Sequence, residues 1–174
     1  KDGLFLWLVE HFDVGDIEDC YHRYNVTPNK GKGGIETVFW NVDSVGRICK
    51  DKRIIYKPNG HRDHDARTYS QYKTRDGYRG RCLFGIQDAR WVVESEKTAI
   101  CCALYFGGDW AATGGKNNTS LINDEHILFP DVDAYQEWEK RFPGQCVKWW
   151  ERLSYNYGEK DDLADYIFNK LENG

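Results

Sequence analysis

Two short apolar runs that each end on carboxylates constrain this chain more than any other feature. Residues 91–93 (WVV) lead into Glu94, and residues 127–130 (ILFP) lead into Asp131 and Asp133. Open α/β sheets build their sites from side chains at the carboxyl ends of buried strands. If the two strands lie side by side, the three acids meet at one edge of the sheet. Three such carboxylates predict a site for a hard divalent cation, Mg²⁺ or Mn²⁺.

The pattern around these runs indicates a parallel sheet, because strand-like and helical segments alternate from residue 91 onward. Ser95 is a suitable N-cap for the first helix, and Glu96 in its first turn suits the helix dipole. We therefore predict an α/β domain over residues 88–174, with a sheet of mostly parallel strands flanked by helices. Strands are predicted at 91–94, 111–113, 127–130 and 146–149, and helices over 95–106, 134–142 and 162–171.

The first half of the chain predicts a small β-rich subdomain over residues 1–87. Residues 35–42 are rich in β-branched and aromatic side chains, and further strands at 47–48 and 53–56 follow a turn. These segments predict an antiparallel meander. Ahead of them, residues 27–34 predict a loop by composition. Residues 4–12 predict a helix, continued over 16–24 with Asp16 as the N-cap.

The net charge of −4 conceals a basic block. Residues 47–90 carry twelve Lys or Arg and five Asp, a local balance of +7, so the other 130 residues carry −11. Such a block favours contact with a polyanion, and the tyrosines at 69, 72 and 78 are suited to stack on unpaired bases. The alternative is a solvated basic face. The predicted nucleic-acid contacts are Arg62, Arg67, Lys73, Arg75, Arg79 and Arg81, with Lys116 in the second domain.

The six cysteines show neither a CxxC pair nor zinc-ribbon spacing. Cys101 and Cys102 are adjacent in an apolar helical run and predict buried thiols, and the cysteine usage favours a reducing cytoplasm. No apolar run reaches the length of a membrane span, and no signal-peptide pattern opens the sequence, so we expect no membrane partner. The start at Lys1 without Met suggests a piece of a longer protein.

The acid-bearing motifs resemble those of the Toprim domain, which bacterial-type primases and topoisomerases share. The resemblance covers roughly residues 88–170 and is closest to the primases of plasmids and mobile elements. Residues 92–99 (VVESEKTA) resemble its first motif, 112–117 (ATGGKN) its glycine-bearing turn, 129–133 (FPDVD) its Asp-x-Asp motif, and 160–166 its closing segment. Residues 37–40 and 56–62 resemble the basic region that precedes the Toprim domain in primase-like proteins.

The resemblance implies metal-dependent nucleotidyl transfer that makes an RNA primer on single-stranded DNA. Nucleotides and the template would be the partners, with a replicative helicase as a further one. Asp131 and Asp133 would hold the metal, and Glu94 would be a general base or a further ligand. Lys97, one turn into the first helix, would pair with a phosphate, unless it is simply an exposed helix residue.

Two other functions fit the same motifs. A Toprim nuclease would use these acids to break a phosphodiester, and a binding module would keep the fold without turnover. A topoisomerase is disfavoured, because its chemistry needs a nucleophilic tyrosine on another domain, for which this chain has no room.

Overall fold

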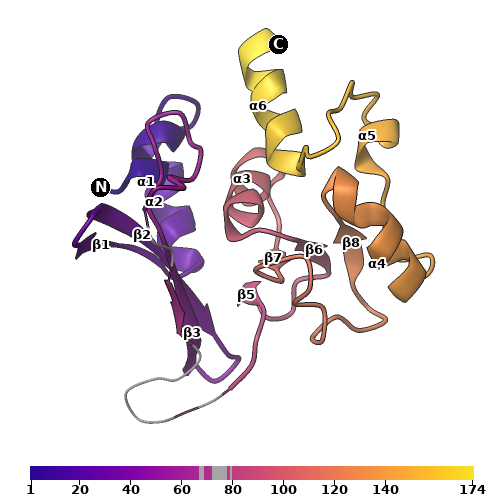
Figure 1. Cartoon of the computed structure of the whole chain (residues 1–174), viewed down its shortest axis with the longest axis horizontal. Coiled ribbons are helices and arrows are strands. Elements are labelled where there is room, and N and C mark those ends of the chain that lie inside the picture. Colours follow the sequence, from indigo (N-terminus) through magenta and orange to yellow (C-terminus); the bar gives the residue numbers. More distant parts are fainter. Residues whose placement is uncertain (67–68, 72–77, 79) are drawn as a thin grey trace. The chain divides into compact units, whose positions relative to one another are not determined.

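A computed structural model describes residues 1–66, 69–71, 78 and 80–174 and divides the chain into two compact units, Lys1–Phe84 and Gly85–Gly174 (Figure 1). The sequence predicts this boundary between residues 87 and 88. Each unit combines helices with a sheet, so the chain is of the mixed α/β class. In the described part of the chain, no helix is both long enough and apolar enough to cross a membrane.

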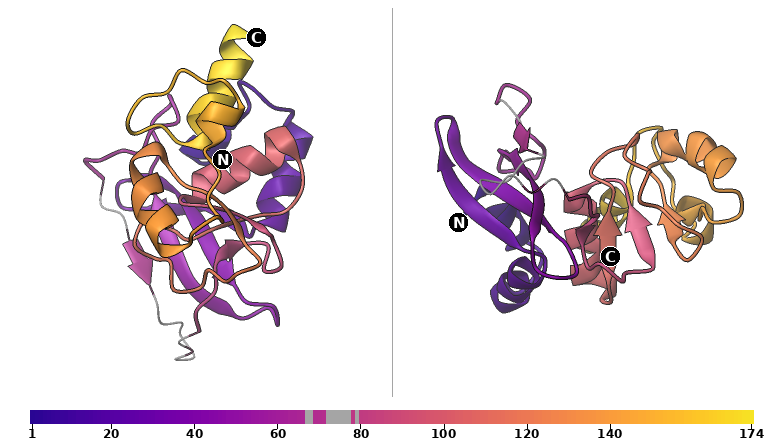
Figure 2. Two further views of the ribbon diagram at one scale, coloured as in Figure 1. Left: turned by 90° about the vertical axis from the view of Figure 1, so that its right-hand side faces the viewer. Right: turned by 90° about the horizontal axis from the view of Figure 1, so that it is seen from below.

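The first unit carries an antiparallel sheet in the order β1-β2-β3-β4 (Figure 2). The predicted antiparallel arrangement is therefore confirmed. The loop predicted at 27–34 is wrong, because most of it pairs with β2 as a strand. Pro28 is tolerated there because β1 is an edge strand, where a missing N–H costs little. The strands are β1 (Val26–Gly31), β2 (Gly34–Val42), β3 (Ile48–Ile54) and β4 (Tyr69–Gln71).

Two helices, α1 (Gly3–Leu8) and α2 (Val14–Arg23), pack against β2 and β1. Asp2 caps α1, and Asp13 caps α2 by accepting a hydrogen bond from the backbone N–H of Gly15 at 2.7 Å. The prediction of Asp16 as a cap is wrong, since Asp16 lies in the first turn, where its charge still suits the helix dipole. The helices and the sheet enclose a core that includes Leu4, Phe5, Leu8, Ile17, Tyr21, Tyr24, Val26, Phe39 and Phe84.

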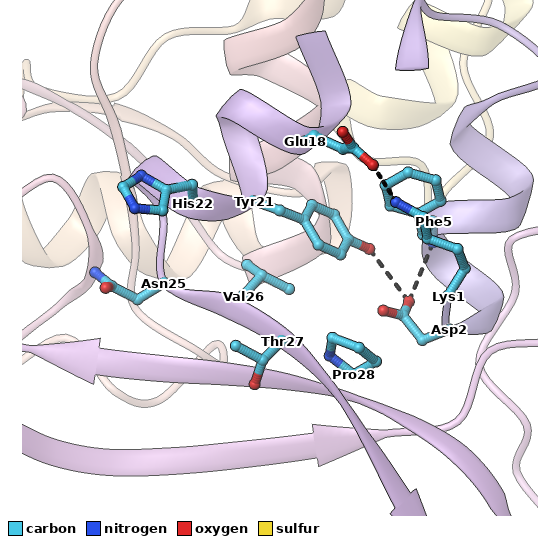
Figure 3. A pocket seen from close by; sticks show the side chains of 10 residues that line it. All are labelled: Lys1, Asp2, Phe5, Glu18, Tyr21, His22, Asn25, Val26, Thr27 and Pro28. Carbon is cyan, nitrogen blue, oxygen red and sulfur yellow. Dashed lines mark hydrogen bonds and ion pairs between the residues drawn. The ribbon is translucent and has the colours of Figure 1, made fainter. Parts of the chain in front are cut away.

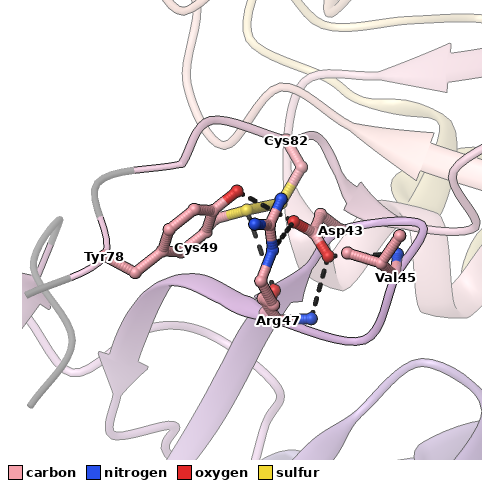
Figure 4. Close-up of polar contacts among 6 residues, drawn as sticks. All are labelled: Asp43, Val45, Arg47, Cys49, Tyr78 and Cys82. Carbon is pink, nitrogen blue, oxygen red and sulfur yellow. Dashed lines mark hydrogen bonds and ion pairs between the residues drawn. A yellow bond between two sulfur atoms is a disulfide. The ribbon is translucent and has the colours of Figure 1, made fainter. Parts of the chain in front are cut away.

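A disulfide joins Cys49 on β3 to Cys82, 33 positions later (Figure 4). Beside it, Asp43 accepts hydrogen bonds from Arg47 Nε and Tyr78 Oη, each at 2.9 Å. Desolvation alone would raise the pKa of Asp43, but hydrogen bonds from Arg47 and Tyr78 lower it to about 2. The cysteine spacing does not predict this disulfide, and neither does a reducing cytoplasm. Only the folded chain brings the two Cα atoms to 6.3 Å, a separation that a disulfide spans.

The second unit carries a sheet in the order β5-β7-β6-β8, in which β6 is parallel to β7 and β8. Parallel pairing is therefore confirmed for these three strands, and a helix lies between β6 and β7 as predicted, whereas no helix lies among the described residues between β7 and β8. The strand predicted at 146–149 is wrong, because Cys146 makes only an isolated bridge to Leu128 and the chain enters a helix at Trp149. The strands are β5 (Phe84–Gly85), β6 (Trp91–Val93), β7 (Trp110–Ala112) and β8 (Ile127–Phe129). The helices are α3 (Glu96–Phe106), the 3-10 helix η1 (Val132–Ala134), α4 (Tyr135–Arg141), α5 (Trp149–Arg152) and α6 (Leu163–Asn173).

Helix α3 forms much of the core of the second unit and packs against α6. Ser95 caps it as predicted, accepting a hydrogen bond from the Thr98 N–H at 3.1 Å. Cys101 and Cys102 are fully buried free thiols, as predicted, and burial raises the pKa of Cys102. The surrounding core includes Val92, Val93, Ile100, Ala111, Ala112, Leu128, Trp138, Trp149 and Ile167.

Candidate active site

Three parallel strands end level at one edge of the second sheet. Val93 at the end of β6 pairs with Ala112 at the end of β7 and with Phe129 at the end of β8. Glu94 follows β6 directly, and Asp131 follows β8 after one proline. The predicted side-by-side arrangement of the two acid-bearing strands is therefore confirmed, at the sheet edge where open α/β folds place their sites.

Glu94 has a fixed backbone and one buried side-chain oxygen without a partner. Its carbonyl oxygen accepts hydrogen bonds from Gly114 N at 2.9 Å and from Thr113 Oγ1 at 3.2 Å. Its half-buried side chain leaves Oε2 without a hydrogen-bond partner among the described residues. Burial raises the pKa of Glu94, as does the charge of Asp133, while Lys116 opposes both. A carboxylate in this state is suited to accept a proton or to bind a cation.

A glycine turn after β7 brings Lys116 to the acids. Gly114 and Gly115 have φ values of 78° and 153°, which permit a sharp turn directly after the strand. Lys116 Nζ lies 3.6 Å from Asp133 Oδ2 and donates to the Asp133 carbonyl oxygen at 3.3 Å. Trp138, which is buried, donates from Nε1 to the Lys116 carbonyl oxygen at 3.0 Å. Contacts at both its backbone carbonyl and its ammonium group therefore hold Lys116 in place.

The two carboxylates of the Asp-x-Asp motif lie in different environments. Asp131 is half-buried, and burial, followed by the charges of Asp162 and Glu94, raises its pKa to about 9. Asp133 is exposed and is paired with Lys116. Burial and like charges thus disfavour the charged form of Asp131. We define the acid cluster as Glu94, Asp131, Asp133 and Asp162.

Asp162 is the member of the acid cluster that the sequence does not predict. It caps α6 in a reciprocal pair with Asp165: Oδ1 accepts from the Asp165 N–H at 3.1 Å, and Asp165 accepts from the Asp162 N–H at 2.8 Å. Its Oδ2 accepts from Thr98 Oγ1 on α3 at 2.7 Å. The Asp-x-x-Asp pattern signals a helix start. The 64 positions between Asp162 and Thr98 hide the tertiary contact.

Replacing Thr98 with Val is expected to destabilise the second unit by about 1–3 kcal/mol, because it leaves a buried hydrogen bond to a charged acceptor unmade. Thr98 is 1% exposed, and Val has nearly the same shape as Thr. The loss of stability therefore measures the contribution of the Thr98 hydroxyl group. Chemical denaturation measures the change. Thr98→Ser keeps the hydroxyl and serves as the control. Equal destabilisation by both variants would contradict the assignment.

Lys97 is half-buried and not an exposed helix residue. Burial lowers its pKa, but the charges of Asp162, Asp165 and Asp131, together with the neighbouring Cys101, raise it above its ordinary value. The ammonium group therefore stays charged near the acid cluster. Its predicted role as a phosphate ligand stays a prediction.

The acid cluster suits a hard cation by its chemistry. In the described part of the chain, no group of three or more His, Cys, Asp or Glu side chains is arranged so that it could hold a metal ion as it stands. Glu94 nevertheless offers an oxygen that no described residue donates to, and burial together with like charges raises the pKa values of Glu94 and Asp131. A divalent cation relieves such repulsion, with water and phosphate oxygens completing its shell. Ligation by Glu94, Asp131 and Asp133 stays a prediction.

The predicted nucleic-acid contacts divide between the two units. Arg62 and Arg81 are exposed residues of the first unit. Lys116 lies beside Asp133 in the second unit. The remaining four, Arg67, Lys73, Arg75 and Arg79, lie outside the described residues. Contact of these side chains with DNA stays a prediction.

The comparisons with known proteins point to one family and one fold. A family model described as "Domain of unknown function (DUF6371)" matches residues 2–132, whereas no curated protein matches. Among solved structures, the chain is similar to the primase fragment of the bacteriophage T7 primase-helicase protein, with a TM-score of 0.59 and 14% identity over 90% of this chain and 66% of that one. It is also similar to a DNA primase domain from Pseudomonas aeruginosa, with a TM-score of 0.35 and 21% sequence identity. This match covers 69% of this chain and 40% of that domain. The first likeness shows a primase-like fold.

Proposed function

The chain belongs to the family described as "Domain of unknown function (DUF6371)", and we propose that it is a primase-type nucleotidyltransferase. It would make RNA primers on single-stranded DNA in the replication of a plasmid or mobile element. The observation that carries this proposal is the acid cluster at the carboxyl edge of parallel strands, in a primase-like fold. Fold alone would not suffice, because one fold hosts many functions.

The acid cluster and its lysines are suited to phosphoryl-type chemistry. Asp131 and Asp133 would hold magnesium, with Glu94 as general base or further ligand. When bound, the metal would neutralise charge on the nucleotide phosphates. Lys97 and Lys116 would bind phosphate oxygens, since both are cations next to these acids. The raised pKa of Glu94 favours it as acceptor of a proton from a primer or nucleotide hydroxyl.

Arg62, Arg67, Lys73, Arg75, Arg79 and Arg81 would form the track for the template strand. Such contacts neutralise phosphates and make binding weaken as salt rises. A replicative helicase is proposed as a further partner, because the similar bacteriophage T7 fragment comes from a primase-helicase protein.

Glu94→Gln is expected to lower primer synthesis by roughly 100- to 10,000-fold, the range for removing a general base. The assay follows labelled ribonucleotides into short RNA on a single-stranded template with Mg²⁺. Glu125→Gln, the same change at an exposed loop position, is the control and keeps full activity. Unchanged synthesis by Glu94→Gln would contradict the assigned role.

The same assay distinguishes the other two functions. Nicked DNA without RNA product would indicate a Toprim nuclease. DNA retention with neither product, unaffected by Glu94→Gln, would indicate a binding module.

A further inference from the structure

The first unit contains a pocket of about 440 Å³ between α1, α2 and β1 (Figure 3). Its walls are mainly apolar: Phe5 and Tyr21 meet edge to face with ring centroids 5.4 Å apart, and Val26 and Pro28 line the side formed by β1. The volume and the mainly apolar lining, which includes two aromatic rings, are typical of small-molecule sites.

The buried end of this pocket is formed by the carboxylate of Asp2, whose side chain is almost completely buried. Oδ1 accepts three hydrogen bonds, from Phe5 N at 3.1 Å, Tyr21 Oη at 3.2 Å and Thr37 Oγ1 at 2.6 Å. Oδ2 is buried and has no hydrogen-bond partner among the described residues. In Figure 3 this second oxygen lies on the side of Pro28. A buried acceptor without a donor costs free energy, so a ligand that supplies an N–H would stabilise this end of the pocket.

The charges around the pocket determine what that ligand must carry. Lys1 pairs with Glu18 and lies 3.8 Å from the centroid of the Phe5 ring, so its charge is already compensated. Asp2 and Glu18 bring two carboxyl groups to this pocket, against the one ammonium group of the Lys1 side chain. An anionic group such as a phosphate is therefore disfavoured beside Asp2, whereas a hydrogen-bond donor on a flat apolar body fits both the carboxylate and the walls.

We propose that this pocket binds a nucleobase that carries an exocyclic amine. The ring packs between Tyr21 and Pro28. The amine donates to Asp2 Oδ2, and because this oxygen has almost no accessible surface in the structure, binding requires a local side-chain shift that exposes it. His22 and Asn25 line the pocket as well and are the polar side chains nearest to the place of the sugar, whereas the Thr27 hydroxyl accepts a hydrogen bond from Trp40 Nε1 at 2.8 Å. The need for an amine on a flat ring follows from the pocket, whereas the choice of a nucleobase among such rings rests on the proposed function.

The test compares adenosine with inosine, which has a carbonyl in place of the amine. Binding to the whole chain is measured by calorimetry in EDTA, so that no metal contributes. Adenosine is expected to bind at least about tenfold more tightly than inosine, because a buried acceptor rejects an analogue without the donor. Equal binding of both nucleosides, or no adenosine binding at millimolar concentration, would overturn the proposal.

Asp2→Asn tests the contact itself. The variant keeps an oxygen for the three donors and places an NH₂ group where Oδ2 was, and Asn caps helices as well as Asp does. We expect at least about tenfold weaker adenosine binding and no preference over inosine. Asp16→Asn, the same change at an exposed position of α2, is the control and binds adenosine like the wild type. Should Asp2→Asn fail to fold, the adenosine and inosine comparison on the wild type still decides.

A third probe, arginine amide, distinguishes a nucleobase site from a site for a basic side chain. Tight binding of arginine amide without adenosine binding would overturn the proposal.

The outcome of these binding experiments is separable from the outcome of the primer-synthesis assay that tests the proposed function. Primer synthesis without adenosine binding in this pocket would reject only the pocket. Adenosine binding without nucleotidyl transfer would reject only the proposed function.

Discussion

Asp131→Asn is expected to reduce primer synthesis by roughly 100- to 1,000-fold, the loss typical of removing one group that stabilises transition-state charge. The same variant is expected to be more stable than the wild type in the absence of metal. Asp131 is half-buried among carboxylates and has a pKa of about 9, so its charged form is costly in the folded chain. An uncharged amide of the same shape removes that cost. A gain on the order of 1–3 kcal/mol follows from relieving one buried, uncompensated polar group.

The pH dependence gives a second readout of this variant. Because the pKa of Asp131 rises from 3.8 to about 9 on folding, the folded chain holds a proton that the unfolded chain releases. The stability that this group contributes is complete below the unfolded pKa and is lost as the pH rises through the folded pKa. The wild type should therefore lose stability between about pH 5 and pH 9 more steeply than Asp131→Asn.

Thermal unfolding at several pH values, with EDTA or with Mg²⁺, measures these effects. Mg²⁺ is expected to raise the Tm of the wild type more than that of the variant, because a ligand stabilises the state that binds it. Asp124→Asn, the same change at an exposed loop position, is the control and should match the wild type in activity and Tm. A variant that is inactive but less stable than the wild type would show that Asp131 has a structural role instead.

Reducing the Cys49–Cys82 disulfide is expected to destabilise the first unit by about 3–4 kcal/mol, because the bond closes a long loop and restricts the unfolded chain. The hydrogen bonds of Asp43 with Arg47 and Tyr78 lie beside it and hold the same segment near β3. Loss of the disulfide therefore removes a covalent link between this segment and the sheet and leaves hydrogen bonds, among them that of Asn41 Nδ2 to the Cys82 carbonyl oxygen at 3.0 Å. The measurement is the unfolding midpoint in denaturant, with and without a reductant.

The double variant Cys49→Ser and Cys82→Ser is the matched control for this experiment. It should unfold at the midpoint of the reduced wild type, and a reductant should change it no further. Thiol labelling of the unfolded wild type should find four reactive cysteines before reduction, Cys20, Cys101, Cys102 and Cys146. Six reactive cysteines without reductant would show that the bond does not form in solution.

The acid-bearing strands were predictable because their signal is local. Residues 91–93 and 127–129 are apolar runs, and each is followed within two positions by a carboxylate. Ser95 as a cap and the Gly114-Gly115 turn are equally local, since the backbone itself requires those residue types there. Element type and strand-end acids follow from such patterns. Strand β1 was not predictable, because pairing with β2 outweighs the loop-like composition of residues 27–34.

By itself, the sequence determined the succession of β6, α3 and β7 in the second unit and the placement of Glu94 and Asp131 at strand ends, because hydrophobic periodicity and caps act between near neighbours. Only the tertiary structure decided that Asp162 joins these acids, that Cys49 meets Cys82, and that Asp2 is buried with one oxygen unsatisfied. Each of these facts depends on segments that pack together from distant positions. Burial and charge then alter the chemistry of a side chain in ways that its sequence neighbours do not encode.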